Sequence, residues 1–124
     1  MAKILVVDDD PDFVLNSRNI LEAEGYQVIE AYNGSQALPL MRRERPDLIL
    51  LDVMMSTTLE GLEVCREVRS DPDLQDVPII MISSIASSEY ASEFPEDELI
   101  PIDTWMPKPV DPAALLRAIR RFVA

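Results

Sequence analysis

The feature that most constrains the fold of this 124-residue chain is a set of three apolar runs, each of which ends in a polar residue. The runs are KILVVD at 3–8, LILLD at 48–52 and VPIIMIS at 77–83. Aliphatic residues without polar alternation are typical of parallel strands that are covered on both faces. Since a further strand is expected at 26–31 (YQVIEA), the chain is predicted to build a buried parallel sheet.

Helical segments lie between these strands. Asp10 is a suitable N-cap and Pro11 a suitable first residue for a helix that Gly25 ends. The later helices are expected at about 35–44, 60–70 and 111–123. Pro39 should kink the second helix or shorten its start, because proline lacks a backbone N–H. This alternation predicts an α/β fold, an open doubly wound parallel sheet, in one domain that spans residues 1–124.

Composition excludes several kinds of chemistry. The chain has no histidine and a single cysteine, Cys65, so a zinc or haem site, a histidine-based catalytic triad and an internal disulfide are ruled out. Eleven basic and 23 acidic residues give a net charge of −12, which argues against direct nucleic-acid binding. No apolar stretch approaches the roughly 20 residues that cross a bilayer, and the start MAKILVVDDD does not resemble a signal peptide. A cytoplasmic protein without membrane contact is therefore expected.

Polar residues stand at the ends of the predicted strands. Asp8 and Asp9 follow the first strand, and Asp52 and Ser83 end the third and fourth. A short last strand leads into Lys108. Ligands of a doubly wound sheet bind beyond the carboxyl ends of its strands, so these five side chains are expected at one end of the molecule.

This set of side chains suits phosphoryl chemistry. Three carboxylates close together repel one another, so they need a divalent cation, and ligation by oxygen alone favours Mg²⁺, with Mn²⁺ as a substitute. Asp52 can then attack phosphorus, because phosphoryl transfer requires little beyond an in-line oxygen and cations that spread charge. Lys108 and the Ser83 hydroxyl are suited to contact the phosphoryl oxygens.

The chain resembles a receiver domain of the bacterial two-component response regulators, similar to the chemotaxis receivers. The resemblance covers nearly all 124 residues, through ILVVDDDPD, PDLILLDVMM, VPIIMISS and KPVDP. It implies a flavodoxin-like sheet of five parallel strands in the order 2-1-3-4-5. It also implies that Asp52 accepts a phosphoryl group from a sensor histidine kinase or phosphotransfer protein and that the domain then changes its contacts with an unidentified downstream protein.

The resemblance also assigns roles to single residues. It implies that Asp9, Asp52 and the backbone carbonyl of Met54 bind Mg²⁺ directly. Asp8 is implied to contact the ion through a water molecule. Ser83 and Trp105 stand at the family's switch positions, although a tryptophan is equally well explained as a packed aromatic.

Several positions depart from the family pattern. Ser56 replaces the usual proline, and the loop STTLEG is one residue longer than usual. Prolines and acidic residues interrupt the stretch between Ser84 and Thr104, which predicts a shortened or irregular fourth helix there. The side chains of Met54 and Ile85 cannot orient a hydrolytic water, which predicts a long-lived phosphoryl group.

Two other functions compete with this interpretation. A receiver-shaped module could signal through protein binding without phosphorylation, but such a module would be expected to lack an acid, the nucleophile or the lysine. A metal-dependent phosphohydrolase with an aspartyl nucleophile would need a second acid two residues after Asp52, where this chain has Met54. We therefore expect a phosphoacceptor and not an enzyme.

Overall fold

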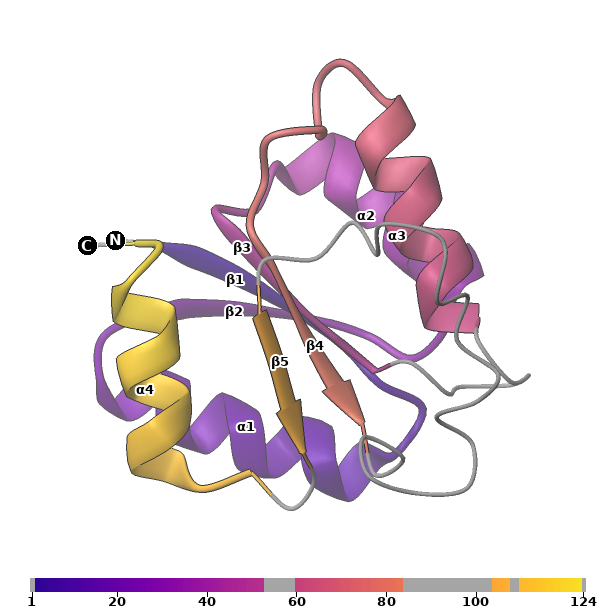
Figure 1. The fold of residues 1–124 in the computed structure, drawn as a ribbon. Helices are drawn as coiled ribbons and strands as arrows, with labels where there is room; N and C mark the ends of the chain where they lie inside the picture. Colours follow the sequence, from indigo (N-terminus) through magenta and orange to yellow (C-terminus); the bar gives the residue numbers. More distant parts are fainter. Residues whose placement is uncertain (1, 53–59, 84–103, 108–109, 124) are drawn as a thin grey trace.

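The computed structural model describes residues 2–52, 60–83, 104–107 and 110–123 (Figure 1). Its strands are β1 (Lys3–Val7), β2 (Gln27–Ala31), β3 (Leu48–Asp52), β4 (Ile79–Ser83) and β5 (Thr104–Pro107). All neighbouring strands run parallel, in the order β2-β1-β3-β4-β5. The predicted α/β fold with an open parallel sheet is therefore confirmed.

Helices cover both faces of this sheet. They are α1 (Pro11–Ala23), α2 (Gly34–Glu44), α3 (Glu60–Ser70) and α4 (Pro112–Arg120). Figure 1 shows α1 and α4 on one face and α2 and α3 on the other. No helix within the described residues is long and apolar enough to cross a membrane.

The core consists of two layers, one on each face of the sheet. Successive residues of a strand point to opposite faces, so Ile4 and Val6 of β1 belong to one layer while Leu5 and Val7 belong to the other. Every residue of β3 is buried, because the strand lies in the middle of the sheet under both helical layers. This double coverage explains why the sequence of β3 carries no polar alternation.

The helix boundaries test the expectations for the helices. Asp10 is the N-cap of α1, and its side chain accepts from the backbone N–H of Asp12, as expected of a capping aspartate. Helix α2 begins at Gly34 and continues past Pro39, so the shortened start is not found. Pro39 lies on the exposed side of the helix. The predicted irregular fourth helix falls on residues 84–103, outside the described residues.

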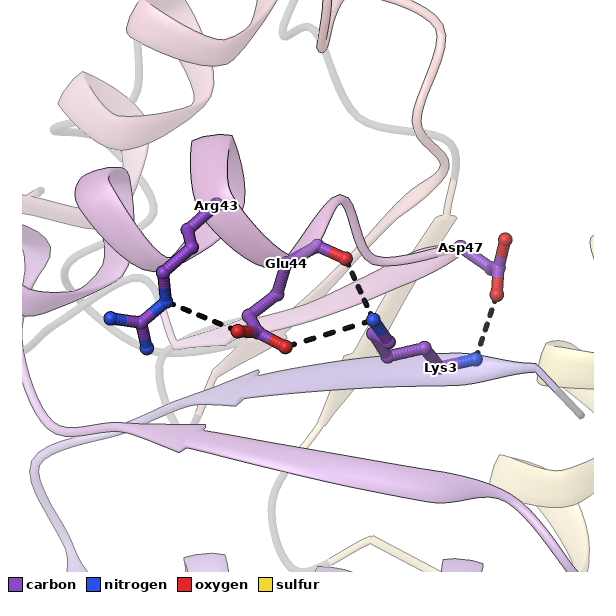
Figure 2. Close-up of polar contacts among 4 residues, drawn as sticks. All are labelled: Lys3, Arg43, Glu44 and Asp47. Carbon is purple, nitrogen blue, oxygen red and sulfur yellow. Dashed lines mark hydrogen bonds and ion pairs between the residues drawn. The ribbon is translucent and has the colours of Figure 1, made fainter.

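A network of polar contacts ties together the amino end of the sheet (Figure 2). The backbone N–H of Lys3 donates to Oδ2 of Asp47 over 2.7 Å, and the N–H of Asp47 donates to the carbonyl of Lys3 over 2.7 Å. The Lys3 ammonium donates to the backbone carbonyl of Glu44 over 2.9 Å and lies 3.6 Å from the Glu44 carboxylate. A cation at the carboxyl end of α2 stabilises the helix dipole and satisfies a carbonyl that has no helical partner.

Candidate metal centre

Three carboxylates meet at the carboxyl end of the sheet. Asp52 is the last residue of β3, and Asp8 and Asp9 directly follow β1. The two strands are neighbours in the sheet, with Val7 paired to Leu51, so their ends lie side by side. One carboxylate oxygen from each of the three aspartates lies within 4.8 Å of the other two. The structure therefore brings together the three acids that the sequence places at strand ends.

Burial makes this cluster electrostatically demanding. Asp8 is 0% exposed and Asp52 is 4% exposed, whereas Asp9 is open to solvent. Like charges repel more strongly where little water screens them, so a cation that binds among the three oxygens lowers their mutual repulsion. The exposed Asp9 leaves a side from which such a cation can enter.

The donor atoms of the cluster fit magnesium. All three are carboxylate oxygens, which a hard divalent cation prefers. Two oxygens that both bind Mg²⁺ directly, each at about 2.1 Å, lie at most about 4.2 Å apart. A separation of no more than 4.8 Å is therefore compatible with one ion that the three carboxylates share.

The local backbone fixes the position of Asp8. Its own N–H donates to the carbonyl of Ala31 over 3.1 Å, which continues the pairing of β1 and β2 by one residue. Its Oδ1 atom accepts from the backbone N–H of Asp10 over 2.9 Å. Asp10 was expected only to cap the first helix. Aspartate side chains commonly accept from the backbone N–H two residues further on, which is the turn that Asp8 forms with Asp10.

The remaining predicted site residues are placed only in part. The backbone of Ser83 ends β4 and pairs with Pro107, the last residue of β5, so both strands end at the edge that carries the carboxylates. Trp105 lies within β5, where it pairs with Met81. The side chains of Ser83 and Trp105, and all of Lys108 and Met54, lie outside what the structure describes.

Comparison with known proteins identifies the family. A family model described as the response regulator receiver domain matches residues 4–120. The chain belongs to this family. The recognition made from the sequence motifs is therefore confirmed, and the carboxylate cluster lies in a receiver domain of two-component signalling.

Individual relatives show how far the likeness extends. The receiver domain is 31% identical to protein PilH of Pseudomonas aeruginosa, over 100% of this chain and 99% of PilH. It is 41% identical to response regulator MprA of Mycolicibacterium vanbaalenii, over 96% of this chain but only 49% of MprA, so it spans about half of that relative. The solved receiver domain of sensor histidine kinase PA1611 from Pseudomonas aeruginosa matches with a TM-score of 0.85 at 27% identity, over 98% of this chain and 96% of that one. That structure holds a magnesium ion coordinated in its active site cleft.

Proposed function

We propose that this receiver domain accepts a phosphoryl group on Asp52, with Mg²⁺ bound among Asp8, Asp9 and Asp52. The observation that carries the proposal is the convergence of these three carboxylates at the edge where β1 and β3 end. The magnesium ion in the PA1611 receiver domain supports the choice of metal. Mn²⁺, which also prefers oxygen ligands, is proposed as a substitute.

The proposed reaction is an in-line transfer from a phosphohistidine of a sensor histidine kinase or a phosphotransfer protein. An oxygen of Asp52 forms the bond to phosphorus while the bond from phosphorus to the donor's nitrogen breaks. The electron pair of the broken bond stays on that nitrogen, which takes up a proton. Bound Mg²⁺ supplies positive charge that stabilises the transferring oxygens.

Other residues are proposed to assist at this edge. Ser83 ends β4 and Lys108 directly follows β5 in the sequence, and both strands end at the same edge of the sheet as β3. We assign their side chains to the phosphoryl oxygens and the backbone carbonyl of Met54 to the metal. Ser83 and Trp105 are the proposed switch residues through which the phosphorylated domain changes its contacts with a downstream protein.

The test compares the same substitution at the two ends of β3. The whole chain is incubated with acetyl phosphate and Mg²⁺ and its intact mass is measured. The unchanged chain should gain about 80 Da, the mass of one phosphoryl group that replaces a proton. Asp52→Asn should abolish this gain because the nucleophile is lost. Asp47→Asn, just before β3, should retain it, because Asp47 lies at the amino end of the sheet (Figure 2).

The mass measurement also separates the competing functions. No added mass on the unchanged chain would contradict the phosphoacceptor role and favour a module that signals through protein binding alone. Added mass that persists in Asp52→Asn would show that another residue is the acceptor. A phosphoacceptor of this kind retains its phosphoryl group for a later partner and has no substrate turnover of its own.

The lifetime of the phosphoryl group is a further proposal. Met54 and Ile85 occupy the positions from which other receivers place a hydrolytic water, and neither side chain has a strong hydrogen-bonding group that could orient one. Both residues lie outside the described part of the chain, so the proposal rests on their identity. We expect the added mass to persist for minutes or longer after acetyl phosphate is removed, and loss within seconds would contradict it.

A further inference from the structure

Two successive aspartate turns connect the carboxylate cluster to helix α1. The backbone N–H of Asp10 donates to Oδ1 of Asp8 over 2.9 Å, and the backbone N–H of Asp12 donates to Oδ1 of Asp10 over 3.0 Å. The carbonyl of Asp10 also accepts from the N–H of Val14 over 3.1 Å, which closes the first turn of the helix. Asp10 is therefore fixed by α1 and in turn holds Asp8.

The orientation of the Asp8 carboxylate depends on this connection. Its backbone is already fixed by the hydrogen bond to Ala31, and its side chain is fully buried. The main freedom left to the carboxylate is rotation about its own side-chain bonds. The N–H of Asp10 is directed at one of its two oxygens and so restricts that rotation. Where this N–H lies depends on how α1 begins.

We propose that Asp10 is a positioning residue for the metal centre, because its side-chain cap on α1 fixes the N–H that orients Asp8 toward Asp9 and Asp52. The inference rests on the proposed Mg²⁺-dependent function and adds a role for Asp10 beyond capping. Neighbours that hydrogen-bond to a metal ligand hold it in its binding geometry, and their loss typically weakens metal affinity by roughly 10- to 100-fold. Asp10 acts here through the acceptor oxygen of its side chain, not through its charge.

The experiment measures Mg²⁺ affinity from the rise in melting temperature of the whole chain as Mg²⁺ is added. Asp10→Ala removes the acceptor for the Asp12 N–H and should weaken Mg²⁺ binding about tenfold. Asp10→Asn removes the charge but keeps an acceptor oxygen, since asparagine caps helices as well as aspartate does. It should therefore bind Mg²⁺ within about twofold of the unchanged chain.

Asp111 provides a matched control. It also precedes a proline at the start of a helix, and its side chain accepts from the N–H of Ala114 over 3.0 Å. Asp111→Ala therefore removes the same kind of cap and the same charge from α4. It should lower the melting temperature without Mg²⁺ but leave the Mg²⁺ affinity within about twofold.

Three outcomes would overturn the inference. Equal losses of affinity in Asp10→Ala and Asp111→Ala would show a general effect of stability, and equal losses in Asp10→Ala and Asp10→Asn would show an effect of charge. Unchanged affinity in Asp10→Ala would show that the cap does not position Asp8. If Asp10→Ala does not fold, Asp10→Gly takes its place with the same expected loss, because glycine destabilises a helix start much less than alanine does.

The outcomes also separate this inference from the proposed function. If the unchanged chain binds no Mg²⁺, the proposed function and this inference both fail. If the unchanged chain and Asp10→Ala bind Mg²⁺ equally well, only the role of Asp10 is contradicted.

Discussion

The two ends of the sheet treat charge in opposite ways. At the carboxyl end, three carboxylate oxygens converge within 4.8 Å, and two of the three side chains are buried. At the amino end, the acids face donors, because the ammonium and the backbone N–H of Lys3 contact Glu44 and Asp47 respectively (Figure 2). Opposite charges at the amino end stabilise the fold, whereas like charges at the carboxyl end favour the binding of a cation.

The same difference is found at the two ends of strand β3. Asp47 precedes the strand and accepts from a backbone N–H of β1, which fixes the start of the β1–β3 pairing. Asp52 ends the strand beside two other acids. A carboxylate at a strand end therefore becomes a candidate functional group through the charge of its neighbours. Position at the end of a strand is not sufficient, since Asp47 has that position as well.

The largest effect is expected from Mg²⁺ itself. At ten times its dissociation constant, Mg²⁺ should raise the free energy of unfolding by about 1.4 kcal/mol, because it binds only the folded cluster. Asp9→Asn should remove most of this gain by deleting the exposed ligand. Urea denaturation with and without Mg²⁺ measures both values.

Asp47→Asn is the matched control at the opposite end. It should retain the full gain from Mg²⁺, since the amide oxygen can still accept from the N–H of Lys3 and the metal binds elsewhere. Two results would contradict the claim that the carboxyl end favours the binding of a cation. One is that Mg²⁺ does not change the stability of the unchanged chain, and the other is that it stabilises Asp9→Asn as much as the unchanged chain.

Without Mg²⁺, substitutions at the two ends should change stability in opposite directions. Asp52→Asn should raise the free energy of unfolding by roughly 1 kcal/mol, because it removes one of three like charges from a functional site. Lys3→Met should lower it by about 0.5 kcal/mol, since the ammonium is partly exposed and its contacts with Glu44 are partly screened. Urea denaturation in the presence of a chelator gives both values, and a shift of the same sign in both variants would contradict the comparison.

The sequence predicted the carboxyl end of the sheet better than the amino end. The apolar runs predict parallel strands, and parallel strands place their carboxyl ends together, so Asp8, Asp9 and Asp52 could be expected to meet. Parallel strands also place their amino ends together, but the rule that ligands bind at the carboxyl ends singles out no residues there. Lys3 and Asp47 are 44 residues apart, and no local pattern indicates that they pair.

Helix boundaries show a second limit of the sequence. The last helix was expected to reach residue 123 because apolar periodicity continues to Phe122 and Val123. It ends at Arg120, although both of these residues are still partly buried against the core. Pro39 was expected to kink α2 or shorten its start. The start is not shortened, because Asn33 caps the helix at Gly34 by accepting from the N–H of Gln36. In neither case does apolar periodicity alone determine the boundary of the helix.

The smallest effect is expected from the pH dependence of stability. It concerns Asp71, a third carboxylate that faces donors, as Glu44 and Asp47 do at the amino end of the sheet. Asp71 lies between α3 and the amino end of β4, where it accepts from the backbone N–H of Asp73 over 2.9 Å and from Arg42 over 3.2 Å. The Asp73 N–H, and next the Arg42 guanidinium, hold the pKa of Asp71 below its ordinary value of 3.8. A carboxylate whose pKa is lower in the folded state stabilises the fold above the unfolded pKa, and this contribution is lost as the pH falls through the folded value.

Asp71→Asn should therefore destabilise the chain slightly at pH 6, and the difference from the unchanged chain should shrink below about pH 4. Urea denaturation across this pH range tests the expectation. Asp76→Asn, at an exposed carboxylate of the same loop, controls for the loss of one negative charge. A difference for Asp71→Asn that stays constant with pH would show that ionisation of this carboxylate does not stabilise the fold. The contacts of Asp71 with Arg42 and the Asp73 N–H would then contribute through hydrogen bonding alone.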